Sequence, residues 1–152
     1  MNTNTTVATV EKSDYQELLR IWEASVRATH HFLEEDDIQY FKPLILNTYF
    51  DAVDLRCIRI NESQEILGFL GVAEGNLEML FIDPGYRGKG IGKTLLDYAV
   101  SQLNVTKVDV NEQNDQAVGF YKYCGFEVIS RSALDSTGKP YPILHMELKD
   151  PV

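Results

Sequence analysis

Residues 83–94 read Asp-Pro-Gly-Tyr-Arg-Gly-Lys-Gly-Ile-Gly-Lys-Thr, and this stretch decides the fold. A hydrophobic segment, residues 77–82, leads into it, and residues 90–103 have the apolar spacing of an amphipathic helix. Alternate glycines let the backbone approach a ligand closely and aim successive N–H groups at one spot. A helix start adds unpaired N–H donors and partial positive charge, and Arg87, Lys89 and Lys93 add cations. We therefore predict a cradle for an anion such as a pyrophosphate at this strand–turn–helix junction.

Two well-known phosphate loops do not fit this stretch. Residues 92–94, Gly-Lys-Thr, resemble the end of a P-loop, but that motif needs a glycine where Arg87 stands. The Rossmann fingerprint would need a third glycine where Lys93 stands. Hairpin strands also precede the turn, which contradicts the strand–helix–strand opening of both folds. A nucleotide enzyme of the P-loop type is therefore disfavoured.

Outward from this junction, hydrophobic periodicity and turn residues predict further strands and helices. The expected strands are residues 6–10, 55–60, 66–73, 77–82, 107–110, 127–130 and 143–148. The expected helices are one capped by Ser13, a second from Glu34 that Pro43 either kinks or restarts, and residues 90–103 and 115–123. No Gly-, Ser- or Pro-rich linker divides the chain. We expect one α/β domain over residues 1–152, with a mixed sheet covered on both faces.

Composition excludes several classes of protein. The 152 residues are 44% hydrophobic and carry a net charge of −9, which argues against disorder, nucleic-acid binding and an anionic membrane partner. No apolar run is long enough to span a membrane, and the N-terminus lacks the pattern of a signal peptide. Two cysteines without a C-x-x-C motif predict free thiols in a reducing cytoplasm. Histidine and carboxylate spacing shows no third ligand for a metal, so we expect none.

Two motifs carry a resemblance to a known family. The phrase at residues 80–84, Leu-Phe-Ile-Asp-Pro, and the following Arg-Gly-x-Gly-Ile-Gly are similar to the cofactor motif of Gcn5-related N-acetyltransferases (GNATs). Downstream, residues 114–126 match the family pattern Asn-x-x-Ala-x-x-x-Tyr-x-x-x-Gly-Phe. Residues 25–33, 111–114 and 138–142 also resemble the YjaB-type branch of small bacterial acetyltransferases. The resemblance thus extends over almost the whole chain.

The resemblance implies the acyl-CoA N-acyltransferase fold, with a mostly antiparallel mixed sheet splayed at the cofactor site. It also implies acetyl-CoA as cosubstrate and acetyl transfer to an amine by direct attack in a ternary complex. Leu80, Phe81 and Ile82 would face the pantetheine arm, with Asn114 and, as a second candidate, Asn111. The residues expected to hold the pyrophosphate are Arg87, Gly88, Lys89, Gly90, Ile91, Gly92, Lys93 and Thr94.

Four side chains are candidates for the chemistry. Tyr121 matches the family tyrosine that protonates the departing thiolate, a role that a phenol protonated at neutral pH can fill. Glu78 and Asp109 are rival bases for the attacking amine, and His30 could be a base, an acceptor contact or a cation at a helix end. The alternative for each is structural: a packed tyrosine, solvated carboxylates, or a histidine that only complements the helix dipole.

The acceptor is open at this stage because one fold serves many substrates. The resemblance implies a primary amine on a small molecule, a protein lysine or an N-terminus, and the acidic composition favours a cationic one. A homodimer is possible. The competing function is a non-catalytic CoA-sensing or partner-binding module on the same fold.

Overall fold

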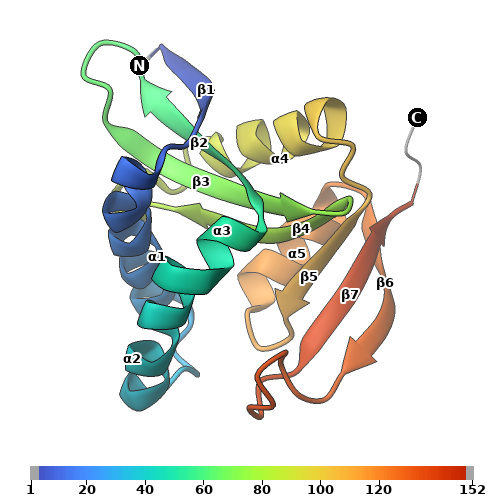
Figure 1. Ribbon diagram of the computed structural model, residues 1–152. Coiled ribbons are helices and arrows are strands. Elements are labelled where there is room, and N and C mark those ends of the chain that lie inside the picture. Colours follow the sequence, from blue (N-terminus) through green and yellow to red (C-terminus); the bar gives the residue numbers. More distant parts are fainter. Residues whose placement is uncertain (1–3, 150–152) are drawn as a thin grey trace.

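In the computed structural model, which describes residues 4–149, one seven-stranded sheet carries helices on both faces (Figure 1). The strand order is β1-β2-β3-β4-β5-β7-β6. The strands are β1 (Thr5–Thr9), β2 (Asp54–Ile60), β3 (Ile66–Ala73), β4 (Asn76–Ile82), β5 (Lys107–Asn111), β6 (Phe126–Ser132) and β7 (Ile143–Leu148). The helices are α1 (Tyr15–Thr29), α2 (Glu35–Leu44), α3 (Phe50–Ala52), α4 (Ile91–Gln102) and α5 (Asp115–Tyr123), with short turns η1 (Lys12–Asp14), η2 (Ile45–Tyr49) and η3 (Pro84–Tyr86). The predicted mixed α/β architecture is confirmed.

The sheet opens between β4 and β5. Strands β1 to β4 pair antiparallel in chain order, and β5, β7 and β6 form a second antiparallel set. Parallel pairing joins the two sets only at Asn76 with Lys107 and Leu77 with Val108. Beyond this contact β4 and β5 diverge (Figure 1). The predicted splay is therefore present, and it leaves backbone groups of both strands without ladder partners.

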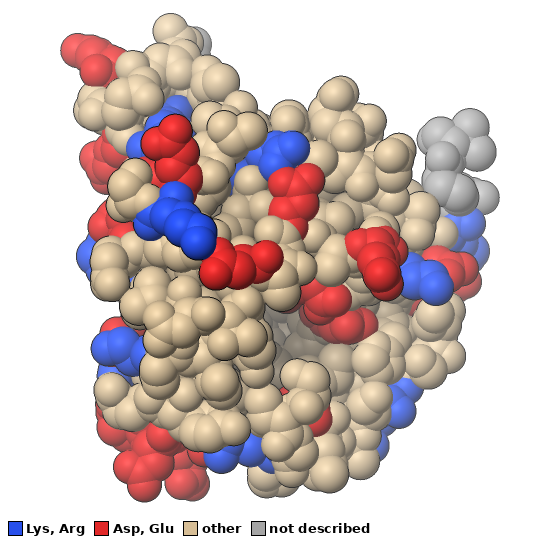
Figure 2. Space-filling model, viewed as in Figure 1, with Lys and Arg blue, Asp and Glu red and all other residues tan. Residues whose placement is uncertain are grey.

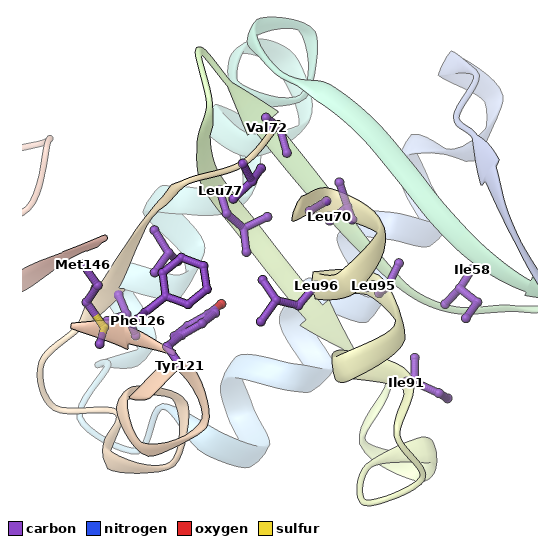
Figure 3. Close-up of a cluster of buried hydrophobic side chains, with 14 of the residues drawn as sticks. Ile58, Leu70, Val72, Leu77, Ile91, Leu95, Leu96, Tyr121, Phe126 and Met146 are labelled. Atoms are coloured by element: carbon purple, nitrogen blue, oxygen red, sulfur yellow. The ribbon is translucent and has the colours of Figure 1, made fainter. Parts of the chain in front are cut away.

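Two hydrophobic cores lie on opposite faces of the sheet. Neighbouring residues of a strand point to opposite faces, so Leu70 and Phe69 of β3 enter different cores. The core on the side of α4 and α5 contains Leu95, Leu96, Tyr121, Phe126 and Met146 (Figure 3). The core on the side of α1 to α3 contains Leu18, Ile21, Trp22 and Phe50. These helices cover the sheet on both faces, and residues of α1 and α5 flank the opening between β4 and β5.

The start of α1 differs from the predicted cap at Ser13. The chain first makes the turn η1, and the backbone N–H of Glu11 donates to the Asp14 carboxylate at 3.0 Å. The other oxygen of Asp14 accepts from Arg59 of β2 at 2.9 Å. The prediction of Ser13 was wrong because local spacing does not reveal Arg59, which lies 45 residues away.

The second helical stretch continues past Pro43 without restarting there. Pro43 lies in the last turn of α2, and the wider π-helical turn η2 follows directly before α3. Proline lacks an N–H and its ring crowds the carbonyl four residues earlier, so a wide turn beside it relieves the mismatch. Of the two predicted outcomes, the new helix at Pro43 was wrong.

Strand β4 carries a β-bulge at Glu78. Its neighbours Leu77 and Met79 pair with consecutive residues of β3, so Glu78 has no partner across that ladder. A bulge re-aims one side chain. Leu77 and Leu80 therefore both pack in the core under α4, although an unbroken strand would point them to opposite faces. Glu78 is left at the opening between β4 and β5, where it lines a cavity.

Candidate functional site

A cavity of about 530 Å³ occupies the opening between β4 and β5. Figure 2 shows this face hollowed near its centre, with acidic side chains at the rim. The volume is typical of sites for small molecules. All residues predicted for the site line this cavity except Lys89 and Thr94. The structure thus brings together segments of α1, β4, the glycine turn, β5 and α5.

The glycine turn, residues 83–94, forms one wall of this cavity, which is the larger of two neighbouring cavities. Gly88 and Gly90 have φ angles of +77° and +81°, which strain any residue with a Cβ. A Cβ at either position would meet no atom within 4 Å, so the backbone conformation is what requires glycine. Gly90 precedes α4 without any side-chain cap, and the N–H groups of the first helical turn therefore have no helical partners. The hydroxyl of Thr94 donates back to the Gly90 carbonyl at 3.0 Å, within the helix.

Two of the three predicted cations line the larger cavity. Arg87 donates to the side-chain oxygen of Gln116 on α5, which ties the turn to that helix. Lys93 pairs with Asp97 at 2.8 Å, and this bond raises the pKa of Lys93. Lys89 is exposed and does not line the cavity. Helix N–H groups with a guanidinium and an ammonium can bind a pyrophosphate.

A second cavity of about 180 Å³ lies on the side of α1 and α2. Its walls are mostly apolar and aromatic, and they include Trp22, Phe41, Tyr49, Met79 and Tyr141. Trp22 is buried and also faces this smaller cavity.

The loop before β7 closes the smaller cavity. Tyr141 donates to the Asp37 carboxylate of α2, and Lys139 pairs with the same carboxylate at 2.9 Å. Lys139 also lies 4.4 Å above the ring of Tyr40. These contacts fasten the loop to α2, so two segments a hundred residues apart in the chain form one wall.

The two cavities share four lining residues, which are His30, Glu78, Phe81 and Asn111. Molecules bound in the two cavities would therefore meet beside the bulge of β4. Chemistry between them is possible only at this junction, and two of its four side chains are ionisable.

Glu78 is a carboxylate poised to take up a proton. It reaches solvent through the cavities, but protein atoms crowd its carboxyl group, and this desolvation raises its pKa. The charge of Asp109 raises the pKa of Glu78 further, whereas the amide of Asn76 and the nearby His145 lower it. The net effect raises the pKa of Glu78 above its ordinary value, as a general base requires.

Asp109 is engaged on both oxygens. Its Oδ1 lies 2.6 Å from Nδ1 of His145, and its Oδ2 accepts from the Asn76 amide at 3.2 Å. On the far side of the imidazole, Nε2 lies 2.7 Å from the Ser132 hydroxyl. Asp109 therefore faces the larger cavity with a histidine and an amide behind it.

His30 is buried and neutral at the end of α1. The Thr29 hydroxyl donates to the Ser25 carbonyl at 2.8 Å, so at the 2.7 Å contact between Thr29 and His30 the ring Nδ1 is the donor. The other ring nitrogen faces the Asn114 amide at 3.4 Å. Burial, with a smaller contribution from His31, lowers the pKa of His30 to about 4. Asn114 also caps α5 through the Ala117 N–H, so it links the two helices that flank the opening.

Tyr121 lies at the inner wall of the larger cavity. Only 6% of its surface is exposed, and its ring packs edge-on against Phe120. The ring also packs edge-on against Phe126 (Figure 3). Burial, aided by Cys124, raises the pKa of Tyr121 well above its ordinary value. The phenol is therefore protonated at neutral pH and can donate a proton into the cavity.

Several residues of this site escaped the sequence prediction. Asn76, Ser132 and Gln116 were not singled out, and no role at the site was predicted for His145. Asp109 and His145 are 36 residues apart and meet only because β7 lies between β5 and β6. Local sequence carries no signal for that strand order.

Two further features concern residues 4–149 alone. In this range no helix combines the length and apolar character needed to cross a membrane. The same residues hold no cluster of three or more His, Cys, Asp or Glu side chains placed to bind a metal ion.

Comparisons with known proteins agree with this site. A family model described as an acetyltransferase (GNAT) domain matches residues 25–148. The peptidyl-lysine N-acetyltransferase YjaB of Escherichia coli is 40% identical over 131 residues, which cover 86% of this chain and 88% of YjaB. Its namesake from Salmonella typhimurium is also 40% identical over 131 residues, with 86% and 89% covered.

Solved structures show the same fold. The solution structure of apo-form YjaB from Escherichia coli superposes with a TM-score of 0.87 at 37% identity, over 95% of this chain and 97% of that one. The PaiA N-acetyltransferase of Thermoplasma acidophilum, solved with coenzyme A, superposes with a TM-score of 0.72 at 20% identity, over 97% and 99% of the two chains. With the family model and the relatives, these structures show that the chain belongs to the GNAT family of N-acetyltransferases.

Proposed function

We propose that this chain transfers the acetyl group of acetyl-CoA to the ε-amine of a lysine in a protein or peptide. One observation carries the proposal: Glu78 stands where a cavity with phosphate-binding groups meets a cavity with apolar walls. The names of the two relatives that are 40% identical support lysine as the acceptor. A cationic acceptor also suits a chain with a net charge of −9.

The larger cavity fits coenzyme A by its volume and its donors. The N–H groups at the start of α4, with Arg87 and Lys93, would hold the pyrophosphate. The backbone of residues 80–82 borders the splay and would bond the amides of the pantetheine arm, and Asn111 and Asn114 offer further polar contacts. Acetyl-CoA supplies the acetyl thioester, whose carbonyl carbon the amine attacks. A backbone N–H at the opening of β4 would stabilise the developing negative charge on that carbonyl oxygen.

The smaller cavity fits the side chain of lysine. Its aromatic walls can pack against the four methylene groups, while the amine reaches the junction beside Glu78. Tyr141, bonded to Asp37, would shield that contact from water. An amine held this way is oriented for attack without further ordering.

Glu78 is our choice for the base. The lysine ammonium gives one proton to the Glu78 carboxylate, and the neutral amine attacks the thioester carbon. The raised pKa of Glu78 suits this transfer, whereas a pKa of about 4 makes His30 a weak base at neutral pH. Asp109 already faces His145 and Asn76, which leaves it less free to accept a proton.

Tyr121 is our choice for the acid. As the C–N bond forms and the C–S bond breaks, the sulfur leaves with the bonding electron pair and takes the phenol proton. As the C–S bond breaks, the attacking nitrogen loses its second proton. That proton passes to the oxygen of Tyr121 and restores the phenol. The products are an N-acetyl-lysine, free CoA and the one proton held by Glu78, which passes to solvent.

The proposal also includes location and assembly. Cys57 and Cys124 are free thiols, which suits a reducing cytoplasm. A homodimer follows only from the family resemblance, and sedimentation of the purified chain across a concentration range tests it.

The deciding experiment measures the release of the CoA thiol from acetyl-CoA with each of four compounds in turn. They are a lysine peptide, the same peptide with acetyl-lysine in place of lysine, a polyamine and an aminoglycoside. The proposal predicts release that depends on the free lysine, with acetyl-lysine found by mass spectrometry. Release with the polyamine or the aminoglycoside alone would keep the enzyme and overturn the acceptor. Tight CoA binding without release for any amine would favour the CoA-sensing module instead.

A further inference from the structure

Polar side chains form a row across four neighbouring strands beside the cavity junction. Glu78 lies on β4, Asp109 on β5, His145 on β7 and Ser132 on β6. Asp109 lies directly opposite His145 in the β5–β7 ladder. The last pair of the β4–β5 ladder is Leu77 with Val108, and the next residues of the two strands are Glu78 and Asp109. Asp109 and His145 therefore lie on one face of the sheet, opposite the core that holds Val108, and Glu78 lines the same cavity as Asp109 from the bulge in β4.

Hydrogen bonds join the side chains of this row. An ionised carboxylate only accepts, so Nδ1 of His145 donates to Asp109 at 2.6 Å. On the far side of the ring, Nε2 lies 2.7 Å from the Ser132 hydroxyl. The order Ser–His–Asp is that of a nucleophilic triad, but neither Ser132 nor His145 lines either of the two cavities. A nucleophile needs access to substrate, so this row has another use.

The row leads inward to Glu78. Asn76 donates to Asp109 at 3.2 Å, and its amide also lowers the pKa of Glu78. Asp109 and Glu78 both line the larger cavity, so their charges face one another across the splay. His145 partly offsets the charge of Asp109 from behind.

We propose that Asp109 and His145 are positioning residues that set the proton affinity of Glu78, Asp109 raising it and His145 limiting the rise. This inference rests on the proposed role of Glu78 as the base. Two neighbouring carboxylates resist ionising together, so a fixed negative charge at Asp109 makes a proton on Glu78 more favourable. The donor from His145 reduces that field. Asp109 and His145 together thus keep the proton affinity of Glu78 high enough to take a proton from the amine and low enough to release that proton afterwards.

Other charged groups face this junction and are part of its field. His30, at the end of α1, is neutral near pH 7 because burial lowers its pKa to about 4. Asp135 lies on the wall of the smaller cavity and adds negative charge there. Two positions along the strands from Asp109 and His145, Lys107 and Glu147 lie 3.9 Å apart and largely cancel one another. The close charge of Asp109 therefore dominates the local field at Glu78.

The test is the titration of Glu78 in the free protein by ¹³C NMR of its carboxyl carbon. We expect Asp109→Asn to lower the pKa of Glu78 by about 1, because the opposing charge is gone. We expect His145→Phe to raise the pKa of Glu78 by about 0.5, because Asp109 then keeps its full field. His145→Asn restores a donor near the position of Nδ1 and should return the pKa of Glu78 towards the wild-type value. Ser132→Ala, at the outer end of the row, is the matched control and should change the value little.

Kinetics give an independent readout. The acid limb of kcat/KM reports the base in the free enzyme, so it should move to lower pH in Asp109→Asn and to higher pH in His145→Phe. Equal pKa values of Glu78 in wild type, Asp109→Asn and His145→Phe would overturn the inference, as would shifts in the same direction. Full turnover of Glu78→Gln would instead overturn Glu78 as the base, and the NMR titration would still judge the coupling among the three side chains.

Discussion

Burial acts on two ionisable residues of this site in the same direction, because it favours the protonated form of each. At Tyr121 it raises the pKa of a phenol that is already protonated at neutral pH, so the proton stays available for a leaving thiolate. At Glu78 it raises the pKa of a carboxyl group that would otherwise be too weak a base. Both changes follow from the cost of placing a charge away from water. The two side chains differ in exposure, because Tyr121 is buried whereas Glu78 is exposed at the cavity junction, so desolvation acts more strongly on Tyr121.

Tyr121→Phe tests the acid directly. The variant keeps the ring that packs against Phe120 and Phe126, so folding and CoA binding should be retained. Turnover should fall about a hundredfold, which is a common contribution of one general acid. The measurement is kcat by thiol release together with CoA affinity by calorimetry. Tyr123→Phe removes a hydroxyl from the same helix at a residue that is 86% exposed, and it should change neither value. Equal turnover in the two variants would exclude Tyr121 as the acid.

Arg87→Glu tests the phosphate cradle. Arg87 lines the larger cavity, and a charge-assisted hydrogen bond to a phosphate contributes about 1.5–3 kcal/mol. We therefore expect CoA to bind at least about tenfold more weakly, measured by calorimetry at fixed ionic strength. Lys122→Glu makes the same change in charge on the exposed side of α5 and controls for the field of the whole protein. Equal affinities in the two variants would contradict the cradle.

At the scale of elements, two glycines with open space around them should respond oppositely to alanine. Gly90 has a φ of +81°, so Gly90→Ala should cost about 1–2 kcal/mol in the free energy of unfolding. Gly119 lies inside α5, and Gly119→Ala should add about 0.5–1 kcal/mol because it restricts the unfolded chain. Urea unfolding at neutral pH measures both changes. Destabilisation by both variants would mean that packing, rather than backbone conformation, decides at these positions.

Much of the element order could be predicted because the signals are local. The glycine turn, the amphipathic spacing of α1 and the motif on α5 each lie within a short stretch of sequence. The cap of the first helix, which was predicted wrongly, and the bulge in β4, which was not predicted, depend on distant partners. Asp14 replaces Ser13 at the start of the first helix because Arg59 reaches it from β2. The bulge at Glu78 needs a mismatch between β3 and β4 that neither strand reveals alone.

The residues of the site likewise fall into those that local sequence reveals and those that depend on distant strands. The residues that would contact coenzyme A lie in two continuous motifs, so the sequence alone could name them. Glu78 and Asp109 could be proposed only as rivals, because their difference lies in surroundings that come from other strands. His145 reaches Asp109 from β7, which the chain visits after β6 but which the sheet places before it. That placement is a property of the tertiary fold, and it distinguishes the surroundings of the two rival carboxylates.

At the scale of the whole molecule, the net negative charge of the chain contrasts with the basic side chains of the glycine turn, where the pyrophosphate of coenzyme A would bind. The chain carries 23 acidic against 14 basic side chains, so its long-range field repels anions and attracts cations. Arg87 and Lys93 place positive charge on the wall of the larger cavity that the glycine turn forms. Acetyl-CoA would therefore be held by short-range contacts, while a basic peptide would be steered from a distance.

This difference predicts an effect of salt on acceptor choice. Raising the ionic strength from about 0.01 to about 0.15 M shortens the screening length from about 30 to about 8 Å, which removes long-range steering. For a lysine peptide flanked by arginines, kcat/KM should fall several-fold over that range. For the same lysine flanked by alanines, the value should change far less, because the methylene and amine contacts within the smaller cavity are short-range. The two peptides share one reacting amine, so any effect of salt on chemistry or on acetyl-CoA binding cancels in their ratio. A ratio that stays constant with salt would mean that the acceptor is recognised only within the cavity and that the acidic surface plays no part in its selection.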